Sequence, residues 1–277
     1  MAAGFLGRLI GRRRRDDVHI PDDLWAKLLE QHPICRGLGE ARLGALRERT
    51  REVLARISID RAREVPDEPA LRLSVALQAA LPVLELGVVW YRAVRTILLV
   101  PQEYETELTT VDEAGVVHEG VDTISGEAGP QFPVVLSVAD VEASGWGDGY
   151  NVVIHEMAHI LDATSGELDG TPALPLGLEP QQWARVSAAA RADHERRVLR
   201  EERRGAAQNR GAAQNRGAAA GGPPVLDPYA AEGPEEFFAC SAELFFERPR
   251  KLRRAYPELF EQLTLFFGFD PAGSASD

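Results

Sequence analysis

Two histidines four positions apart, His155 and His159, have the residue type and spacing of metal ligands. They belong to the stretch Val152–Asp162, which reads VVIHEMAHILD. Residues four apart on a helix lie on one face about a turn apart, so both imidazoles can reach one ion. Glu156 would then lie beside a water bound to that ion, where a carboxylate can take the water's proton. The pattern H-E-x-x-H therefore predicts a zinc site on a helix over about 150–163.

The neighbours of the two histidines bear on this interpretation. Apart from Glu156 and Asp162 the remaining residues of the stretch are uncharged and mostly apolar, which predicts a buried helix. Two histidines and a glutamate inside a buried helix would be costly without partners. The alternative is a pair of core histidines that hydrogen bonds satisfy.

A zinc site needs a third protein ligand. Position 162 is Asp and position 165 is Ser, so the last histidine of H-E-x-x-H-x-x-G-x-x-H is absent. A carboxylate from a later helix is the main alternative. Gly233 followed by Pro234 predicts the start of such a helix, over 234–247.

Glu236, Cys240 and Glu243 share one face of that helix. We assign Glu236 as the third ligand and Glu243 as an acceptor that orients one of the histidines, with Asp162 as a further such acceptor. Spacing alone leaves open that Glu236 only stabilises a helix N-terminus. In that case Glu243 or Asp162 would be the ligand.

HEMAHILD, followed at a distance by YAAEGPEEFFACSAELFF, resembles the Mlc titration factor A family of zinc metallopeptidases. The likeness continues through LPVLELGVVWYRAVRTILLVP and YPELFEQLTLFFGFDP, so it covers about residues 25 to 271. It implies a gluzincin-like site with one zinc ion per chain, bound by His155, His159 and Glu236, with Glu156 as general base. Tyr229, seven residues before Glu236, would donate to the oxyanion. Without the resemblance, residues 227–229 read as a turn with a packed tyrosine.

The resemblance implies a peptidase of aminopeptidase type that acts on short peptides. The strand expected over 134–138 would offer Val135, Leu136 and Ser137 as an edge with which an extended peptide pairs. The alternative is a regulatory protein that binds and sequesters a transcriptional repressor, as the resemblance also implies. Glu156 and Tyr229 favour the enzyme, because a structural zinc needs no general base. A zinc hydrolase acting on another amide is a third reading.

The order of the expected elements predicts an α+β fold. Helical periodicity covers about residues 22–86. A strand is expected at 96–100, another begins the segment 133–141 and turns at Ala139–Asp140, and glycines at 115–129 suggest a hairpin. Helices follow over about 150–163, 180–203, 234–247 and 257–267. We expect a zincin-like metallopeptidase domain with mainly helical N- and C-terminal parts and a small central mixed sheet.

Composition indicates how the chain is divided into a domain and tails, and which partners it excludes. One domain is expected over 22–271, between a basic flexible tail at 1–21 and a short tail at 272–277. Within it the repeat RGAAQN predicts a disordered loop over 204–224, because it has no large apolar side chain. The net charge of −12 argues against direct nucleic-acid binding. No apolar run is long enough to span a membrane, and a cytoplasmic location is expected.

Overall fold

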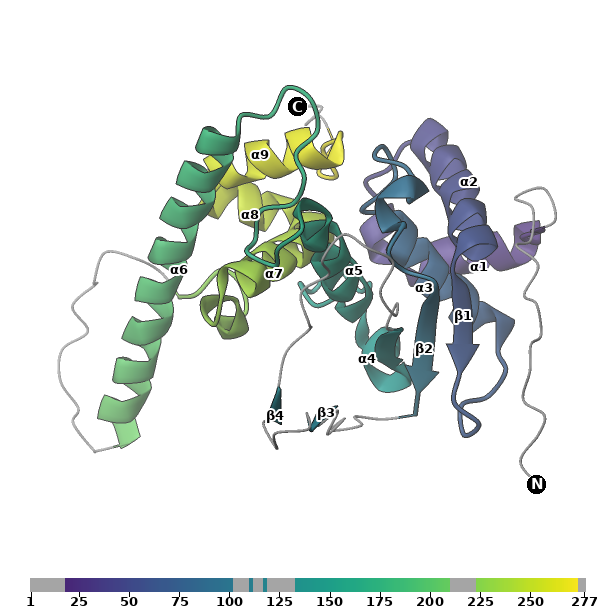
Figure 1. Cartoon of the computed structure of the whole chain (residues 1–277), viewed down its shortest axis with the longest axis horizontal. Coiled ribbons are helices and arrows are strands. Elements are labelled where there is room, and N and C mark those ends of the chain that lie inside the picture. The colour runs from purple at the N-terminus through teal and green to yellow at the C-terminus, as the bar shows by residue number, and fades with distance from the viewer. Residues whose placement is uncertain (1–17, 102–109, 112–116, 119–132, 210–222, 274–277) are drawn as a thin grey trace.

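The computed structural model describes residues 18–101, 110–111, 117–118, 133–209 and 223–273. Its N-terminal part packs three helices together: α1 (Asp22–Gln31), α2 (Glu40–Arg56) and α3 (Pro69–Ala80). Two 3-10 turns, η2 (Pro33–Cys35) and η3 (Val88–Tyr91), join them to the rest of this part. Figure 1 shows these helices gathered over one end of strands β1 and β2.

A small sheet is built from strands that lie before and after α3 in the chain. It contains β1 (Ser58–Arg61), β2 (Thr96–Val100) and β5 (Val134–Ser137) in the order β1-β2-β5, with both pairings parallel. A separate two-stranded ladder pairs β3 (Thr110–Val111) with β4 (Val117–His118) in antiparallel fashion. Within the described residues β5 pairs only with β2, so its other side is an edge.

The C-terminal part is helical. After β5 come α4 (Val138–Ala143), α5 (Val152–Asp162), η4 (Ala163–Ser165) and the long α6 (Pro180–Asn209). The turn η5 (Pro228–Ala231) then leads into α7 (Pro234–Glu247), α8 (Pro249–Ala255) and α9 (Pro257–Phe267). In Figure 1, α6 flanks one side of the molecule, and α5 and α7 lie between it and the N-terminal helices.

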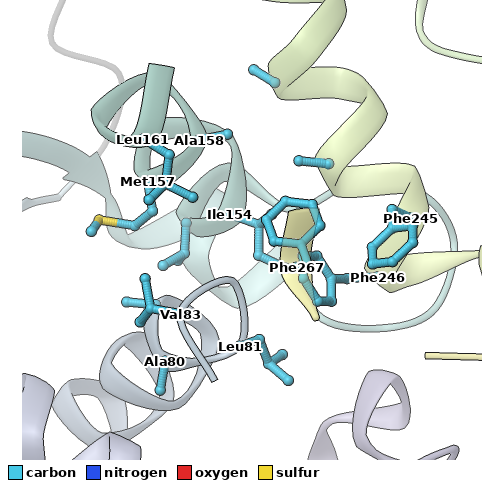
Figure 2. Packing of buried hydrophobic residues seen from close by; sticks show 14 of the residues in the cluster. Ala80, Leu81, Val83, Ile154, Met157, Ala158, Leu161, Phe245, Phe246 and Phe267 are labelled. Carbon is cyan, nitrogen blue, oxygen red and sulfur yellow. The ribbon is translucent and has the colours of Figure 1, made fainter. Parts of the chain in front are cut away.

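The core joins the two parts around α5. One face of α5 buries Ile154, Met157, Ala158 and Leu161, each at most 1% exposed. Figure 2 shows this face between the end of α3 and the phenylalanines of α7 and α9. Each such side chain contributes about 1.5–3 kcal/mol when fully buried, apart from the smaller alanine. The helix with the two histidines is therefore held in place by packing on both sides.

Most of the expected elements are confirmed. The α+β fold with a small sheet is present, β2 has the expected bounds of 96–100, and α7 and α9 have the expected bounds of 234–247 and 257–267. The paired strands of the three-stranded sheet are all parallel, whereas a mixed sheet was expected. Most of the suggested hairpin at 115–129 lies outside the described residues.

Three boundaries were wrong. The helical pattern over 22–86 contains the strand β1, whose pairing with β2 local periodicity does not reveal. Residues 204–209 belong to α6, although a disordered loop was expected from 204, because alanine, arginine and glutamine all favour helix continuation. Ile20, expected in a flexible tail, is 1% exposed and packs in the core. Most of the rest of these two predictions falls on residues 1–17 and 210–222, which are not among those described.

Candidate metal centre

The helix α5 begins at a side-chain cap. Asn151 has extended backbone angles, and its Oδ1 accepts the N–H of Ile154 at 2.9 Å, which satisfies one of the free donors of the first turn. From this start, His155 and His159 are on the same side of the helix, with ring centroids 4.8 Å apart. Both histidines are half-buried, and their neighbours Ile154 and Ala158 are in the core.

The helix α7 begins beside the end of α5. Gly233 is extended, Pro234 occupies the first turn, and Glu236 follows near the positive end of the helix dipole. Gly170 lies against this start with φ +76°, and a Cβ on it would meet the carbonyl oxygen of Pro234 at 2.4 Å. Only glycine fits there, so the loop after α5 can approach the first turn of α7 closely.

Two imidazoles and one carboxylate meet where α5 faces α7. Nε2 of His155 lies 3.1 Å from Nε2 of His159 and 3.1 Å from Oε2 of Glu236. Oε1 of Glu236 lies 3.5 Å from Nε2 of His159. These ligand atoms all fall within 4.8 Å of one another. The structure thus brings together the three residues that the sequence assigned as metal ligands.

The chemistry of this group fits a bound cation. Oε2 of Glu236 is buried and forms no hydrogen bond, although it lies close to His155. Burial lowers the pKa of His155, but the Cys240 thiol and the carboxylates of Glu236 and Glu243 outweigh it and raise that pKa to about 12. For the Glu236 carboxylate, burial alone would raise the pKa. The two histidines outweigh this effect and lower that pKa to about 2. The cluster stabilises positive charge between its acceptors, which a divalent ion on these donors would supply.

Glu243 contacts the far side of the His155 ring. Its Oε1 lies 2.8 Å from Nδ1 of His155, and its Oε2 accepts the backbone N–H of Asn151 at 2.6 Å. A proton on Nδ1 leaves Nε2 free to face Glu236 and His159. Cys240 is buried one turn earlier on α7 with a free thiol, and burial raises its pKa to about 11.

Glu156 lies in the same region. Within the described part of the chain its half-buried carboxylate forms no hydrogen bond or ion pair. Burial raises its pKa, His155 and His159 oppose this increase, and Glu236 and Glu243 add to it. A carboxylate with a raised pKa is a stronger proton acceptor when ionised, which suits a general base.

Tyr229 reaches the cluster from the turn η5. Its ring centroid lies 6.2 Å from that of His155, and the residue is 45% exposed. Burial and the carboxylates of Glu236 and Glu232 raise the pKa of its phenol, so the proton is retained. The backbone N–H of Tyr229 donates to Oδ1 of Asp227 at 2.9 Å, which fixes the start of the turn.

The structure does not bring Asp162 to a histidine. Its Oδ2 accepts the N–H of Gly170 at 2.8 Å, and its Oδ1 is buried without a hydrogen bond. Burial raises the pKa of Asp162 to about 7. This carboxylate therefore holds the glycine that lies against α7, and its assigned role toward a ligating histidine stays a prediction.

The strand expected over 134–138 is present as β5, and its role toward a substrate stays a prediction. Val135 is exposed, Leu136 is in the core, and Oγ of Ser137 accepts the N–H of Asp140 at 3.3 Å to cap α4. The strand ends at Ser137, one residue earlier than expected, since Val138 begins α4. Within the described residues, the side of β5 away from β2 pairs with no strand, and Val135 is its exposed side chain.

Two residues that support the site were not found from the sequence. Nε2 of the buried His194 on α6 lies 3.0 Å from the backbone oxygen of Asp227, at the turn that carries Tyr229. Nδ2 of Asn151 donates to Glu247 and to Gln78, both at 2.8 Å. An asparagine before a helical apolar run is an N-cap signal and could have indicated Asn151. No sequence pattern marks His194.

Comparison with known proteins now places this chain. The model of the glucose-regulated metallo-peptidase M90 family matches residues 8–268. The chain belongs to this family. It is 32% identical to Mlc titration factor A of Edwardsiella ictaluri over 240 residues, covering 86% of this chain and 85% of that protein. It is 31% identical to the proteins of that name from Klebsiella pneumoniae strain 342 and Escherichia coli O1:K1, covering 73% and 71% of this chain and 70% and 68% of theirs.

Family membership makes the cluster of His155, His159 and Glu236 the candidate metal site of a metallopeptidase. The family resemblance expected from the sequence is thereby confirmed. Among the helices that the structure describes, none is long and apolar enough to cross a membrane.

Proposed function

We propose that this chain is a zinc-dependent peptidase. The observation that carries the proposal is the convergence of Nε2 of His155, Nε2 of His159 and the Glu236 carboxylate. Two imidazoles and one carboxylate are a ligand set of catalytic zinc sites, in which a fourth position stays open for water. A zinc ion bound there would lower the pKa of its water and polarise the scissile carbonyl.

The chain's own residues supply the remaining chemistry. Glu156 takes a proton from the attacking water and passes it to the leaving amine. The phenol of Tyr229 donates to the oxyanion that develops on the scissile carbonyl. Glu243 keeps His155 in the orientation that ligation requires, as its 2.8 Å contact with Nδ1 supports.

The substrate class in this proposal is short peptides cleaved from the amino end. The free edge of β5 supports peptide binding, because an extended substrate can pair its backbone with such an edge. A peptide with an N-methyl group at the pairing position should bind less tightly than its unmethylated counterpart. Equal affinity of the two would contradict pairing at β5.

A second function is proposed from the relatives. They are named Mlc titration factor A, a name that describes an effect on Mlc. By analogy, this chain would bind and sequester a transcriptional repressor in the cytoplasm, with peptide cleavage secondary. This function needs an exposed binding surface and does not need Glu156 as a general base.

The test of the metal site compares three proteins. Zinc per chain is measured by elemental mass spectrometry for the unmodified chain, Glu236→Ala and Glu235→Ala, after the same exhaustive dialysis. Glu235 is the neighbouring acid in the first turn of α7, so its replacement controls for charge and helix stability. We expect one zinc in the unmodified chain and in Glu235→Ala, and a large loss in Glu236→Ala. Equal zinc in all three would show that another carboxylate is the ligand.

Cleavage then separates the two functions. Amino-acid amides and N-terminally blocked peptides are offered to the zinc-loaded chain and to Glu156→Gln. An aminopeptidase should cleave the amino-acid amides and leave the N-terminally blocked peptides intact. The rate of cleavage should be lower by a factor of about 10² or more in Glu156→Gln. A zinc-loaded chain that cleaves neither substrate but binds purified Mlc would favour the regulatory function.

A further inference from the structure

A hollow lies where α7 meets α8. It has a volume of about 970 Å³. Segments distant in the sequence line it: Pro33, Ile34 and Gly37, Gly147, Arg197 of α6, residues 223–225, the end of α7 with α8, and residues 271–272. None of the candidate ligands His155, His159 and Glu236 lines it, and neither Glu156, Tyr229 nor Glu243 does. We call it the cationic pocket, because its lining includes five basic side chains: Arg197, Arg248, Arg250, Lys251 and Arg254.

Three of these cations pair with no acid in the part of the chain that the structure describes. Arg248, Arg250 and Arg254 are exposed and form no ion pair within the described residues. Elsewhere many arginines pair with acids, for example Arg197 with Asp193 at 2.6 Å. The chain has 43 acidic and 31 basic residues. The cations around this hollow therefore form a locally positive surface on a protein whose net charge is negative. The local potential favours an anion there.

The single acid of the pocket is already engaged. Glu247 is 5% exposed, and its two oxygens accept from Nδ2 of Asn151 at 2.8 Å and from the N–H of Gly147 at 2.6 Å. Lys251 is also partly engaged, because its Nζ donates to the backbone oxygen of Val225 at 2.7 Å. The guanidinium groups of Arg248, Arg250 and Arg254 are therefore the groups left for a ligand.

The rest of the lining is apolar and stiff. Side chains such as Ile34 and Phe246 contribute to it together with prolines at positions 33, 223, 224, 249 and 271. Proline fixes its own φ angle, so these walls lose little freedom when a ligand binds. A volume of this size is at the upper end of the range for small-molecule sites, about 300–1,000 Å³.

We propose that the cationic pocket binds a small organic phosphate. The phosphoryl oxygens would accept hydrogen bonds from the guanidinium groups. A planar guanidinium can donate two parallel hydrogen bonds to one phosphate group. The organic part would lie on the apolar walls. The net charge of −12 disfavours a nucleic-acid backbone, which would extend beyond the pocket over an acidic surface.

The test is isothermal titration of the zinc-loaded, full-length chain with inorganic phosphate and with adenosine 5′-monophosphate. We expect saturable binding of both at low millimolar concentration or better, tighter for the organic phosphate, and none for uncharged adenosine. The variant Arg248→Gln/Arg254→Gln should lose about tenfold or more in affinity. The matched control is Arg63→Gln/Arg92→Gln, which removes the same charge from two exposed arginines that line no part of the pocket.

Each other outcome overturns the proposal. An equal loss in both double variants would mean a general effect of net charge. Absence of saturable binding of both phosphates would leave the pocket a solvated surface. Binding of hexaglutamate without binding of either phosphate would reassign the pocket to an acidic peptide. Zinc content is measured in every variant and should not change, so failure here is independent of failure at the metal centre.

Discussion

Glu243 and His155 face each other across α5 and α7, with Oε1 of the carboxylate 2.8 Å from Nδ1 of the ring. The other oxygen of Glu243 accepts the backbone N–H of Asn151, the residue that caps α5. One buried carboxylate therefore fixes both the start of α5 and the orientation of the His155 ring on it. Its desolvation is offset by two short hydrogen bonds.

The first prediction concerns this contact. Glu243→Gln should weaken zinc binding about 10–100-fold, because an amide cannot accept from both Nδ1 of His155 and the N–H of Asn151 as well as a carboxylate does. Competition with a chelator of known zinc affinity measures the change. Glu235→Gln, which removes a charge from the same helix without touching His155, should bind zinc as the unmodified chain does. Equal affinity of the two variants would contradict an orienting role for Glu243.

Much of this site could be predicted from local sequence patterns. His155 and His159 follow from their spacing, and Glu236 follows from a helix start combined with the face shared with Cys240 and Glu243. What the pattern could not give is the contact between α5 and α7, which depends on the packing of residues such as Ile154 and Phe246 that are far apart in sequence.

The features that were not predicted also depend on contacts between residues far apart in the sequence. The strand β1 reads SIDR, with only Ile59 buried, so its identity depends on the pairing partner β2 and not on its own residues. His194 acts on the turn of Tyr229 from α6, 33 positions before the Asp227 carbonyl that it contacts. Tyr229 itself was indicated by family resemblance, since a turn with a tyrosine has no distinctive spacing.

The second prediction tests His194 as a positioning residue for Tyr229. His194→Ala should lower kcat for peptide cleavage about tenfold with little change in zinc content, because the turn at Asp227 loses its anchor. In a Tyr229→Phe background the same substitution should have much less effect, since the two act through one group. His194→Gln, which keeps a donor, should recover part of the activity.

His19→Ala is the matched control, because His19 is exposed and far from η5 in sequence. Unfolding curves show whether each variant is folded at the assay temperature. Equal losses from His194→Ala in both backgrounds would mean that His194 acts on stability or on another part of the site.

The third prediction concerns the support of α7 by α9. Phe267 is fully buried, with its ring centroid 5.2 Å from that of Phe245 and 4.9 Å from that of Phe246. Phe267→Ala should lower the free energy of unfolding by about 3–5 kcal/mol, through lost burial and the cavity that remains. The control is Leu265, which is on the same helix and 53% exposed. Leu265→Ala should change the free energy of unfolding by less than about 0.5 kcal/mol. Urea unfolding of both variants measures the difference.

The fourth prediction concerns pH and Glu247. Burial, together with the charges of Asp148 and Glu243, raises the pKa of Glu247 to about 7, and the hydrogen bonds from Asn151 and Gly147 only partly oppose this. In the unfolded chain the pKa is near its ordinary value of 4.5. The stabilisation from protonated Glu247 is therefore complete below pH 4.5, decreases as the pH rises toward 7, and is lost above that.

The measurement is the free energy of unfolding at pH 5 and pH 7.5 for the unmodified chain and Glu247→Gln. Glutamine does not titrate, so the decrease between the two pH values should be smaller in this variant, by on the order of 2–3 kcal/mol. Its single oxygen also leaves one of two donors unsatisfied, but that cost is the same at both pH values. Glu64→Gln, at an exposed position, should keep the pH dependence of the unmodified chain. A parallel pH dependence in all three proteins would show that Glu247 ionises at the same pH in the folded and unfolded states.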